Sequence, residues 1–174
     1  SKNDITLASP EIRILKRTEK FSENVALIDN KYGDFTEFLE KSKRASREGF
    51  GAGSVVYLRS VFESVIKQVG ATENISDTFV DKNGKTQHKS TERYLKEVNE
   101  KRNIIPAEFS NDGYRLFREL SGVVHGNCSE KEALLKFNAF YRLVTGVLEK
   151  IKTNQELMEA IGTLGWNTGG DEDE

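Results

Sequence analysis

Hydrophobic residues recur at three- and four-residue intervals along most of the chain. This spacing places apolar side chains on one face of an α-helix. The two prolines, Pro10 and Pro106, leave the longest of these stretches uninterrupted. The predicted helices cover 34–48, 54–69, 90–103, 110–127, 129–152 and, as a short last helix, 154–165. The pattern therefore predicts an all-α fold.

Two of the predicted helices begin with residues at capping-box spacing. In a capping box, a short polar side chain and a Glu three positions later satisfy the first backbone amides of a helix. Asp34 and Glu37 have this spacing, and so do Ser129 and Glu132. We expect a helix to begin at each pair.

The segments between the helices carry turn signals. Asn83 followed by Gly84 favours a tight turn, and the polar stretch around it predicts a loop or a small hairpin over about 72–90. Gly126 and Asn127, after the 110–127 helix, are residue types that tolerate a left-handed C-terminal turn. These signals divide the chain into separate helices.

The length of 174 residues suits one domain. We expect a compact bundle of four to five helices over 31–165, with the short last helix added to it. The segment 1–30 is poorly defined, because its EIRILKR stretch fits either a strand or a helix. The acidic residues at the end predict a disordered tail over 166–174. The chain begins at Ser1 and its single methionine is Met158, so we expect it to be a piece of a longer protein.

Composition narrows the classes of function. The 26 Lys and Arg residues are balanced by 28 Asp and Glu residues, so nucleic-acid binding would depend on a local basic patch. A single cysteine, Cys128, excludes a disulfide framework and a multi-cysteine zinc site. No apolar run approaches the roughly 20 residues of a membrane span, and no leader peptide opens the chain. We therefore expect a cytoplasmic protein that has no membrane contact, no metal and no cofactor.

The 110–127 helix carries the candidate chemistry. At about 100° per residue, its apolar residues define one buried face. That face consists of Leu116, Phe117, Leu120, Val123 and Val124. Arg118 and His125 fall on the opposite side, about two turns apart along the axis, and Tyr114 and Ser121 lie beside them on the same polar stripe of the helical wheel. A permanently charged guanidinium and a titratable imidazole on one face suit phosphodiester chemistry.

The segment RELSGVVHGN resembles the Arg-x(4–6)-His signature of HEPN (higher eukaryotes and prokaryotes nucleotide-binding) domains. The segments GAGSVVYLRSVFESVIKQVG and SEKEALLKFNAFYRLVTGVLEKIK likewise resemble helices that precede and follow this signature in bacterial HEPN-like proteins. Together the three segments cover roughly 34–152.

The resemblance implies a helical bundle that forms a homodimer and brings two Arg and His pairs into one cleft. In active members this cleft cuts RNA without a metal, in bacterial toxins and antiviral defence systems. Carried to this chain, Arg118 holds the scissile phosphate and His125 is the general base or acid at the ribose 2′-hydroxyl. Tyr114, Ser121 and Asn127 are the expected substrate-binding residues.

Other interpretations of the same residues stay open. Glu119 departs from the small polar residue that often follows this Arg in active members, and it would repel a phosphate or neutralise Arg118 or Arg115. His125 could instead be a solvated histidine that favours a helix C-terminus. Many members of the family are non-catalytic, so the alternative function is a helical dimerisation or scaffold module that docks to the rest of its parent chain or to a partner protein.

Several further residues have simpler interpretations. Arg59 and Glu63, one turn apart, predict a partly buried structural ion pair. Cys128 lies near His125, but two candidate ligands are too few for a closed metal site. His88 and the lysines around it predict a solvated turn, with an RNA-contacting arm as the alternative. Lys41, Lys43, Arg44 and Arg47 predict a solvated helix face, with an anionic partner as the alternative.

Overall fold

The computed structural model describes residues 32–112 and 114–166. They belong to one compact unit of the chain, Tyr32–Glu174, and a second unit is Ser1–Lys31. The expectations for the segment 1–30 and for 167–174 of the acidic tail lie outside the described residues.

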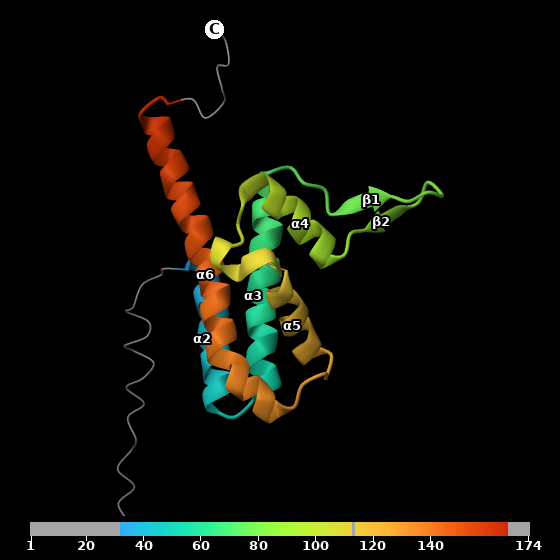
Figure 1. Cartoon of the computed structure of the whole chain (residues 1–174), viewed down its shortest axis with the longest axis vertical. Coiled ribbons are helices and arrows are strands. Elements are labelled where there is room, and N and C mark those ends of the chain that lie inside the picture. Colours follow the sequence, from blue (N-terminus) through green and yellow to red (C-terminus); the bar gives the residue numbers. More distant parts are fainter. Residues whose placement is uncertain (1–31, 113, 167–174) are drawn as a thin grey trace, which may run out of the picture. The chain divides into compact units, whose positions relative to one another are not determined.

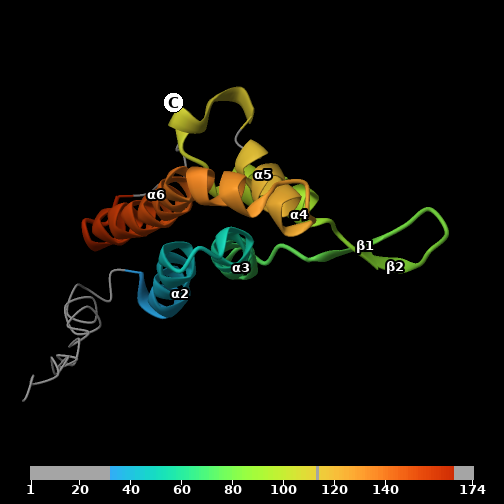
Figure 2. The same cartoon turned by 90° about the horizontal axis from the view of Figure 1, so that it is seen from below.

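The described part is an all-α bundle with one small hairpin, as the sequence predicts (Figure 1). Its elements are the 3₁₀ turn η1 (Gly33–Phe35), α2 (Thr36–Arg47), α3 (Gly51–Thr72), β1 (Thr78–Val80), β2 (Thr86–His88), α4 (Thr91–Arg102), the 3₁₀ turn η2 (Ala107–Asp112), α5 (Arg115–Val124) and α6 (Glu130–Thr163). Helix α3 is central, because α2, α4, α5 and α6 all pack against it. Seen from below, α2 and α3 form one layer and α4, α5 and α6 lie over it (Figure 2).

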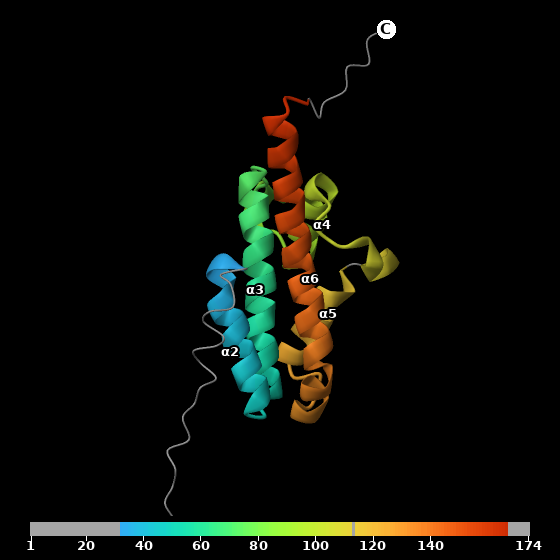
Figure 3. The same cartoon turned by 90° about the vertical axis from the view of Figure 1, so that its left-hand side faces the viewer.

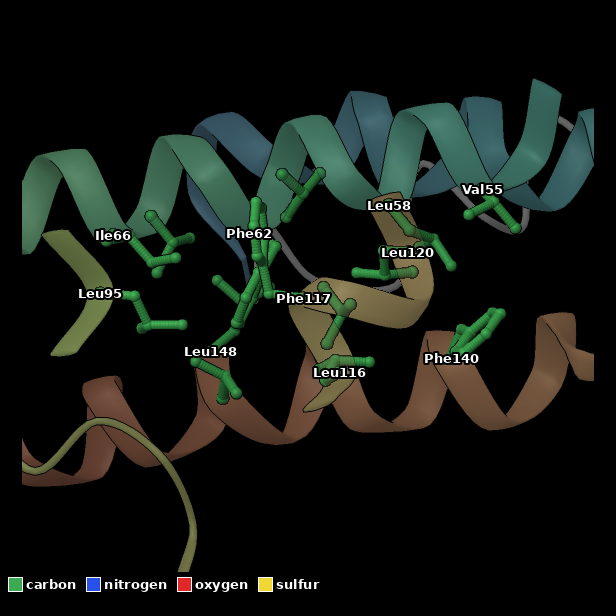
Figure 4. Close-up of a cluster of buried hydrophobic side chains, with 14 of the residues drawn as sticks. Val55, Leu58, Phe62, Ile66, Leu95, Leu116, Phe117, Leu120, Phe140 and Leu148 are labelled. Carbon is green, nitrogen blue, oxygen red and sulfur yellow. The ribbon is translucent and has the colours of Figure 1, made fainter. Parts of the chain in front are cut away.

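Apolar side chains from α2, α3, α4, α5 and α6 form the core around α3, and Figure 4 shows part of it. The labelled members are Val55, Leu58, Phe62 and Ile66 of α3, Leu95 of α4, Leu116, Phe117 and Leu120 of α5, and Phe140 and Leu148 of α6. Each buried side chain of this size contributes about 1.5–3 kcal/mol relative to exposure. The rings of Phe62 and Phe117 stack, with their centroids 6.5 Å apart. This contact fixes the rotation of α5 and therefore decides which of its residues face outward.

One predicted capping box forms and the other does not. Ser129 and Glu132 exchange the reciprocal hydrogen bonds of a capping box at the start of α6. The prediction for Asp34 is wrong, because η1 precedes α2 and moves the first residue of that helix to Thr36. Glu37 then faces Lys41, one turn along, with its carboxylate 2.6 Å from the lysine nitrogen.

The predicted separate C-terminal helix is wrong, because α6 continues without a break from Glu130 to Thr163. The sequence between Leu148 and Met158 contains no glycine and no proline, so nothing interrupts the backbone where the apolar stripe weakens. The last part of α6 projects past the end of α3 (Figure 3).

The stretch after α3 forms the predicted hairpin. Strands β1 and β2 pair antiparallel, with Thr78 opposite His88, and they project away from the helices (Figures 1 and 2). The carboxylate of Asp81 accepts hydrogen bonds from the backbone amides of Asn83 and Lys85, at 2.8 and 2.9 Å. These bonds stabilise the charged form and lower the pKa of Asp81. No helix in the described part is long and apolar enough to cross a membrane.

Candidate functional site

Helix α5 has the two faces that its sequence predicts. Leu116, Phe117, Leu120 and Val123 are buried, and Val124 is half-buried. Arg118 and His125 are both exposed. They lie seven residues apart, which is about two turns and roughly 10 Å along the axis. The structure therefore keeps the imidazole out of the apolar interior, on the same outward side as the guanidinium.

A Schellman turn fixes the backbone at His125. The amide of Gly126 donates to the carbonyl of Val123 at 3.1 Å, and the amide of Asn127 donates to the carbonyl of Gly122 at 3.0 Å. Gly126 has a φ of 81°, which is the left-handed conformation that this turn requires. His125 is the C-cap residue, so its side chain begins at a defined end of α5.

The acidic neighbour of Arg118 comes from another helix. The guanidinium Nε of Arg118 lies 3.9 Å from a carboxylate oxygen of Glu92, in the first turn of α4. Lys96 approaches the same carboxylate at 3.8 Å, and its nitrogen lies 5.3 Å from the centre of the Tyr114 ring. Sequence reasoning on α5 alone missed Glu92, because the contact depends on how α4 packs beside α5.

Glu119 is engaged by two other cations. Its carboxylate lies 2.9 Å from Nε of Arg115, one turn earlier, and 3.8 Å from the nitrogen of Lys136 on α6. Of the two cations that Glu119 was expected to neutralise, Arg115 forms an ion pair with it. Because its charge is shared by Arg115 and Lys136, Glu119 repels a phosphate near Arg118 less than the sequence alone suggests.

The three expected substrate-binding residues have different surroundings. Tyr114 is half-buried at the start of α5 beside Lys96. Ser121 is half-buried, and its hydroxyl oxygen is buried with no hydrogen-bond partner among the described residues. Asn127 is exposed, and its backbone completes the turn after His125. Tyr114 and Asn127 therefore flank the outward face of α5 at its two ends, whereas the hydroxyl of Ser121 is not exposed on that face.

A pocket of about 430 Å³ lies elsewhere, between the end of α3, the end of α4 and the second half of α6. Its apolar lining includes Val69, Ile104 and Ile151, and Arg102 and Glu73 form an ion pair at its edge. Neither Arg118 nor His125 lines this pocket.

The other candidate residues have simple surroundings. Arg59 and Glu63 form the predicted ion pair at 3.0 Å, with both side chains about three-quarters covered. His88 lies exposed in the hairpin, 3.7 Å from the carboxylate of Asp77. Cys128 is half-buried, and no cluster of three or more metal-ligating side chains exists within the described ranges.

In comparisons with known proteins, no family model, no curated protein and no solved structure matches this chain.

Proposed function

We propose that the outward face of α5 contacts RNA and that the chain is a HEPN-like, metal-independent endoribonuclease. The observation that supports this proposal is the joint exposure of Arg118 and His125 on one side of a helix whose other side is buried. A phosphodiester can approach both groups without any rearrangement of the core. The setting of a bacterial toxin or an antiviral defence system is part of the same proposal and follows from the HEPN resemblance alone.

The charges around α5 favour an anionic ligand. Arg118 and Lys96 share the carboxylate of Glu92, and Arg115 and Lys136 share that of Glu119. These contacts join exposed or half-buried side chains, and such pairs contribute only about 0–1 kcal/mol each. An RNA phosphate, which accepts two parallel hydrogen bonds from a guanidinium, can therefore replace Glu92 at Arg118.

The reaction follows from the two side chains. The imidazole of His125 removes the proton from a ribose 2′-hydroxyl, and the 2′-oxygen forms a bond to the adjacent phosphorus. The bond from phosphorus to the 5′-oxygen of the next nucleotide breaks, and that oxygen takes a proton from a protonated histidine. Arg118 binds the phosphate oxygens and stabilises their increased charge in the transition state. In a homodimer that pairs the α5 faces, the second His125 supplies that proton, and Tyr114 and Ser121 lie at the contact between the copies.

The test is cleavage of single-stranded RNA by purified protein in the presence of a chelator. Loss of a general base costs on the order of 10²- to 10⁴-fold in rate, so His125→Ala should reduce cleavage by at least about 100-fold. The matched control is His88→Ala, which removes the other histidine of the chain from an exposed position in the hairpin. Equal cleavage by wild-type protein and His125→Ala, with unchanged helical circular dichroism, contradicts the assignment.

The contact between Arg118 and Glu92 favours a second candidate, a non-catalytic helical module that dimerises or docks to a partner. In this function, Arg118 links α5 to α4 and does not bind RNA. Glu92→Gln separates the two functions. For an RNA-binding Arg118, the variant should bind RNA a few-fold more tightly, because the competing carboxylate is gone. For a structural Arg118, RNA binding stays absent and the melting temperature falls.

A further inference from the structure

The base of the hairpin is attached to the first turns of α4. The guanidinium carbon of Arg93 lies 4.3 Å from the centre of the Phe79 ring, and the ammonium group of Lys89 pairs with the carboxylate of Glu97. The backbone amide of Lys89 also donates to the carbonyl of Asp77, at 2.8 Å. Because a two-stranded hairpin alone is only marginally stable in water, these contacts hold it in one direction relative to α4.

The tip of the hairpin, residues 81–85, is held by its own hydrogen bonds. The carboxylate of Asp81 accepts the backbone amides of Asn83 and Lys85, at 2.8 and 2.9 Å. The side-chain amide of Gln87 donates to the other oxygen of the same carboxylate, at 2.9 Å. The acid at the tip is therefore occupied by amide groups of the hairpin itself.

Two lysines at the tip have charges that the fold does not use. Lys82 and Lys85 are exposed, and neither ammonium group forms an ion pair or a hydrogen bond with any residue in the described ranges. The stretch from Lys82 to Lys89 contains no acid. Lys41 and Lys96, in contrast, each lie beside a carboxylate one turn away. An anion can therefore bind the two lysines of the tip without breaking a contact within the chain.

The hairpin and the outward face of α5 are joined through the first turn of α4. Glu92 lies beside Arg118 of α5, and the next residue, Arg93, packs on Phe79 of β1. Figures 1 and 2 show α5 and the hairpin on the same side of α3. Four residues of extended chain carry Lys85 about 13 Å beyond Lys89. A ligand at Arg118 must therefore be extended if it is also to reach the tip.

We infer that Lys82 and Lys85 bind phosphates of an RNA strand that runs from Arg118 past the start of α4 to the tip of the hairpin. The inference rests on the proposed function, because the strand is the one bound at the outward face of α5. Phosphate contacts of this kind position a strand and do not read its sequence. The substrate is therefore an RNA several nucleotides longer than the two that the scissile bond joins, and the hairpin contributes affinity and no chemistry.

His88 is not part of the proposed contact. It pairs with Thr78 at the base of the hairpin, and its imidazole lies 3.7 Å from the carboxylate of Asp77. The two lysines lie at the opposite end of the strands. His88→Ala therefore remains the control for the cleavage assay.

The first measurement is the binding of a fluorescently labelled single-stranded RNA of about 20 nucleotides. The full-length His125→Ala variant is the parent, so that the RNA stays intact. Each contact between a cation and a phosphate of a single strand contributes about 0.7 to the slope of log K against log salt. Adding K82A/K85A should reduce the slope by about 1.4 and the affinity about 25-fold at 0.1 M salt. K82R/K85R keeps both charges and should restore the affinity.

The matched control is K67A/K101A in the same parent. It removes the same charge at exposed lysines of α3 and of the last turn of α4, and it should bind RNA like the parent. Alanine at position 85 keeps the backbone amide that donates to Asp81, so the turn stays intact in K82A/K85A. The melting temperature and circular dichroism of each variant check that the fold is unchanged.

The second measurement is cleavage by protein that retains His125. A dinucleotide contains only the scissile phosphate and does not reach the tip. K82A/K85A should reduce kcat/KM for the long RNA by a factor similar to the loss of affinity, through an increase in KM, and should leave kcat/KM for the dinucleotide unchanged. Cleavage of the dinucleotide reports on α5 alone, so failure of the inference and failure of the proposed function give different results.

Three results overturn the inference and leave the ribonuclease intact. One is cleavage of RNA by wild-type protein together with equal affinity and salt dependence of K82A/K85A and its parent. Another is an equal loss of affinity for K67A/K101A, which would reflect net charge alone. The third is a polyglutamate peptide of similar length that binds as tightly as RNA and depends equally on the two lysines, which would assign the tip to an acidic protein. Wild-type protein that neither binds nor cuts RNA contradicts the proposed function, and the inference fails with it.

Discussion

The two halves of α6 have the same backbone and opposite surroundings. From Glu130 to about Ile151, a buried residue recurs at nearly every turn of the helix. From residue 153 onward no side chain is buried, and the helix nevertheless continues to Thr163. The first half packs in the core, whereas the second contributes no buried side chain and borders the pocket beside Val69 and Ile104. The apolar periodicity of the sequence therefore marks how far α6 is packed in the core. It does not mark how far the helix extends.

Truncation of a large side chain in each half should show the largest difference. Phe140 is 5% exposed and packs in the core, so Phe140→Ala should cost about 3–5 kcal/mol of unfolding free energy. Leu157→Ala, in the last part of α6, should change it by less than about 0.5 kcal/mol. Urea denaturation followed by circular dichroism measures both. A similar loss for the two variants would mean that Leu157 packs within its own chain.

Substitution of glycine by alanine should change stability in opposite directions at Gly51 and Gly162. A Cβ atom at Gly51 would collide with the carbonyl oxygen of Glu130, where the starts of α3 and α6 meet. Gly51→Ala should therefore destabilise the fold by about 1–3 kcal/mol. No atom outside its own helix lies within 4 Å of a Cβ at Gly162, so Gly162→Ala should stabilise the last turns of α6 by up to about 1 kcal/mol.

These two variants need different measurements. The melting temperature reports the effect of Gly51→Ala on the whole fold, and amide hydrogen exchange in the last turns of α6 reports the local effect of Gly162→Ala. Slower exchange at unchanged melting temperature is the expected result for Gly162→Ala. Faster exchange in these turns would mean that a Cβ at Gly162 meets a neighbouring group.

The sequence predicts those features of the fold that depend on residues close together in the chain. The wheel of α5 placed Arg118 and His125 outward, because five apolar residues define the opposite face, and four of them are buried in the structure. The sequence also identified the Ser129 capping box, whose members are three residues apart. Both predictions rest on helical geometry alone.

Features that depend on contacts between helices could not be predicted in this way. The pairing of Arg118 with Glu92 requires α4 beside α5, and nothing in the spacing of either helix reveals it. The break expected after Lys152 was wrong for a related reason, because the loss of apolar periodicity marks the end of packing and not the end of a helix. Action on RNA would require contacts between the exposed face of α5 and another molecule, and the spacing of residues within the chain does not reveal such contacts.

The smallest expected difference between two variants concerns the capped start of α6. Ser129→Ala removes the acceptor for the Glu132 amide and should cost about 1 kcal/mol at neutral pH. In the wild type, hydrogen bonds from the backbone amide and the hydroxyl of Ser129 lower the pKa of Glu132. A carboxyl with a lowered folded-state pKa binds more protons when the chain is unfolded, so acid favours unfolding. The Glu132 carboxylate therefore stabilises the fold fully above the ordinary pKa of Glu, about 4.3. This stabilisation is lost as the pH falls through the lower pKa of the folded state.

The difference in stability between wild type and Ser129→Ala should therefore shrink as the pH is lowered from 7 to about 3, since the variant lacks one of the two bonds that hold the pKa of Glu132 down. Ser90→Ala is the matched control, because Ser90 caps α4 through the amide of Arg93, and no capping-box carboxylate is described there. Its cost should be similar at neutral pH and nearly independent of pH. Urea denaturation at several pH values measures both differences. Equal pH dependence of the two variants would show that the charge of Glu132 does not stabilise the start of α6. The first half of that helix would then depend on packing alone.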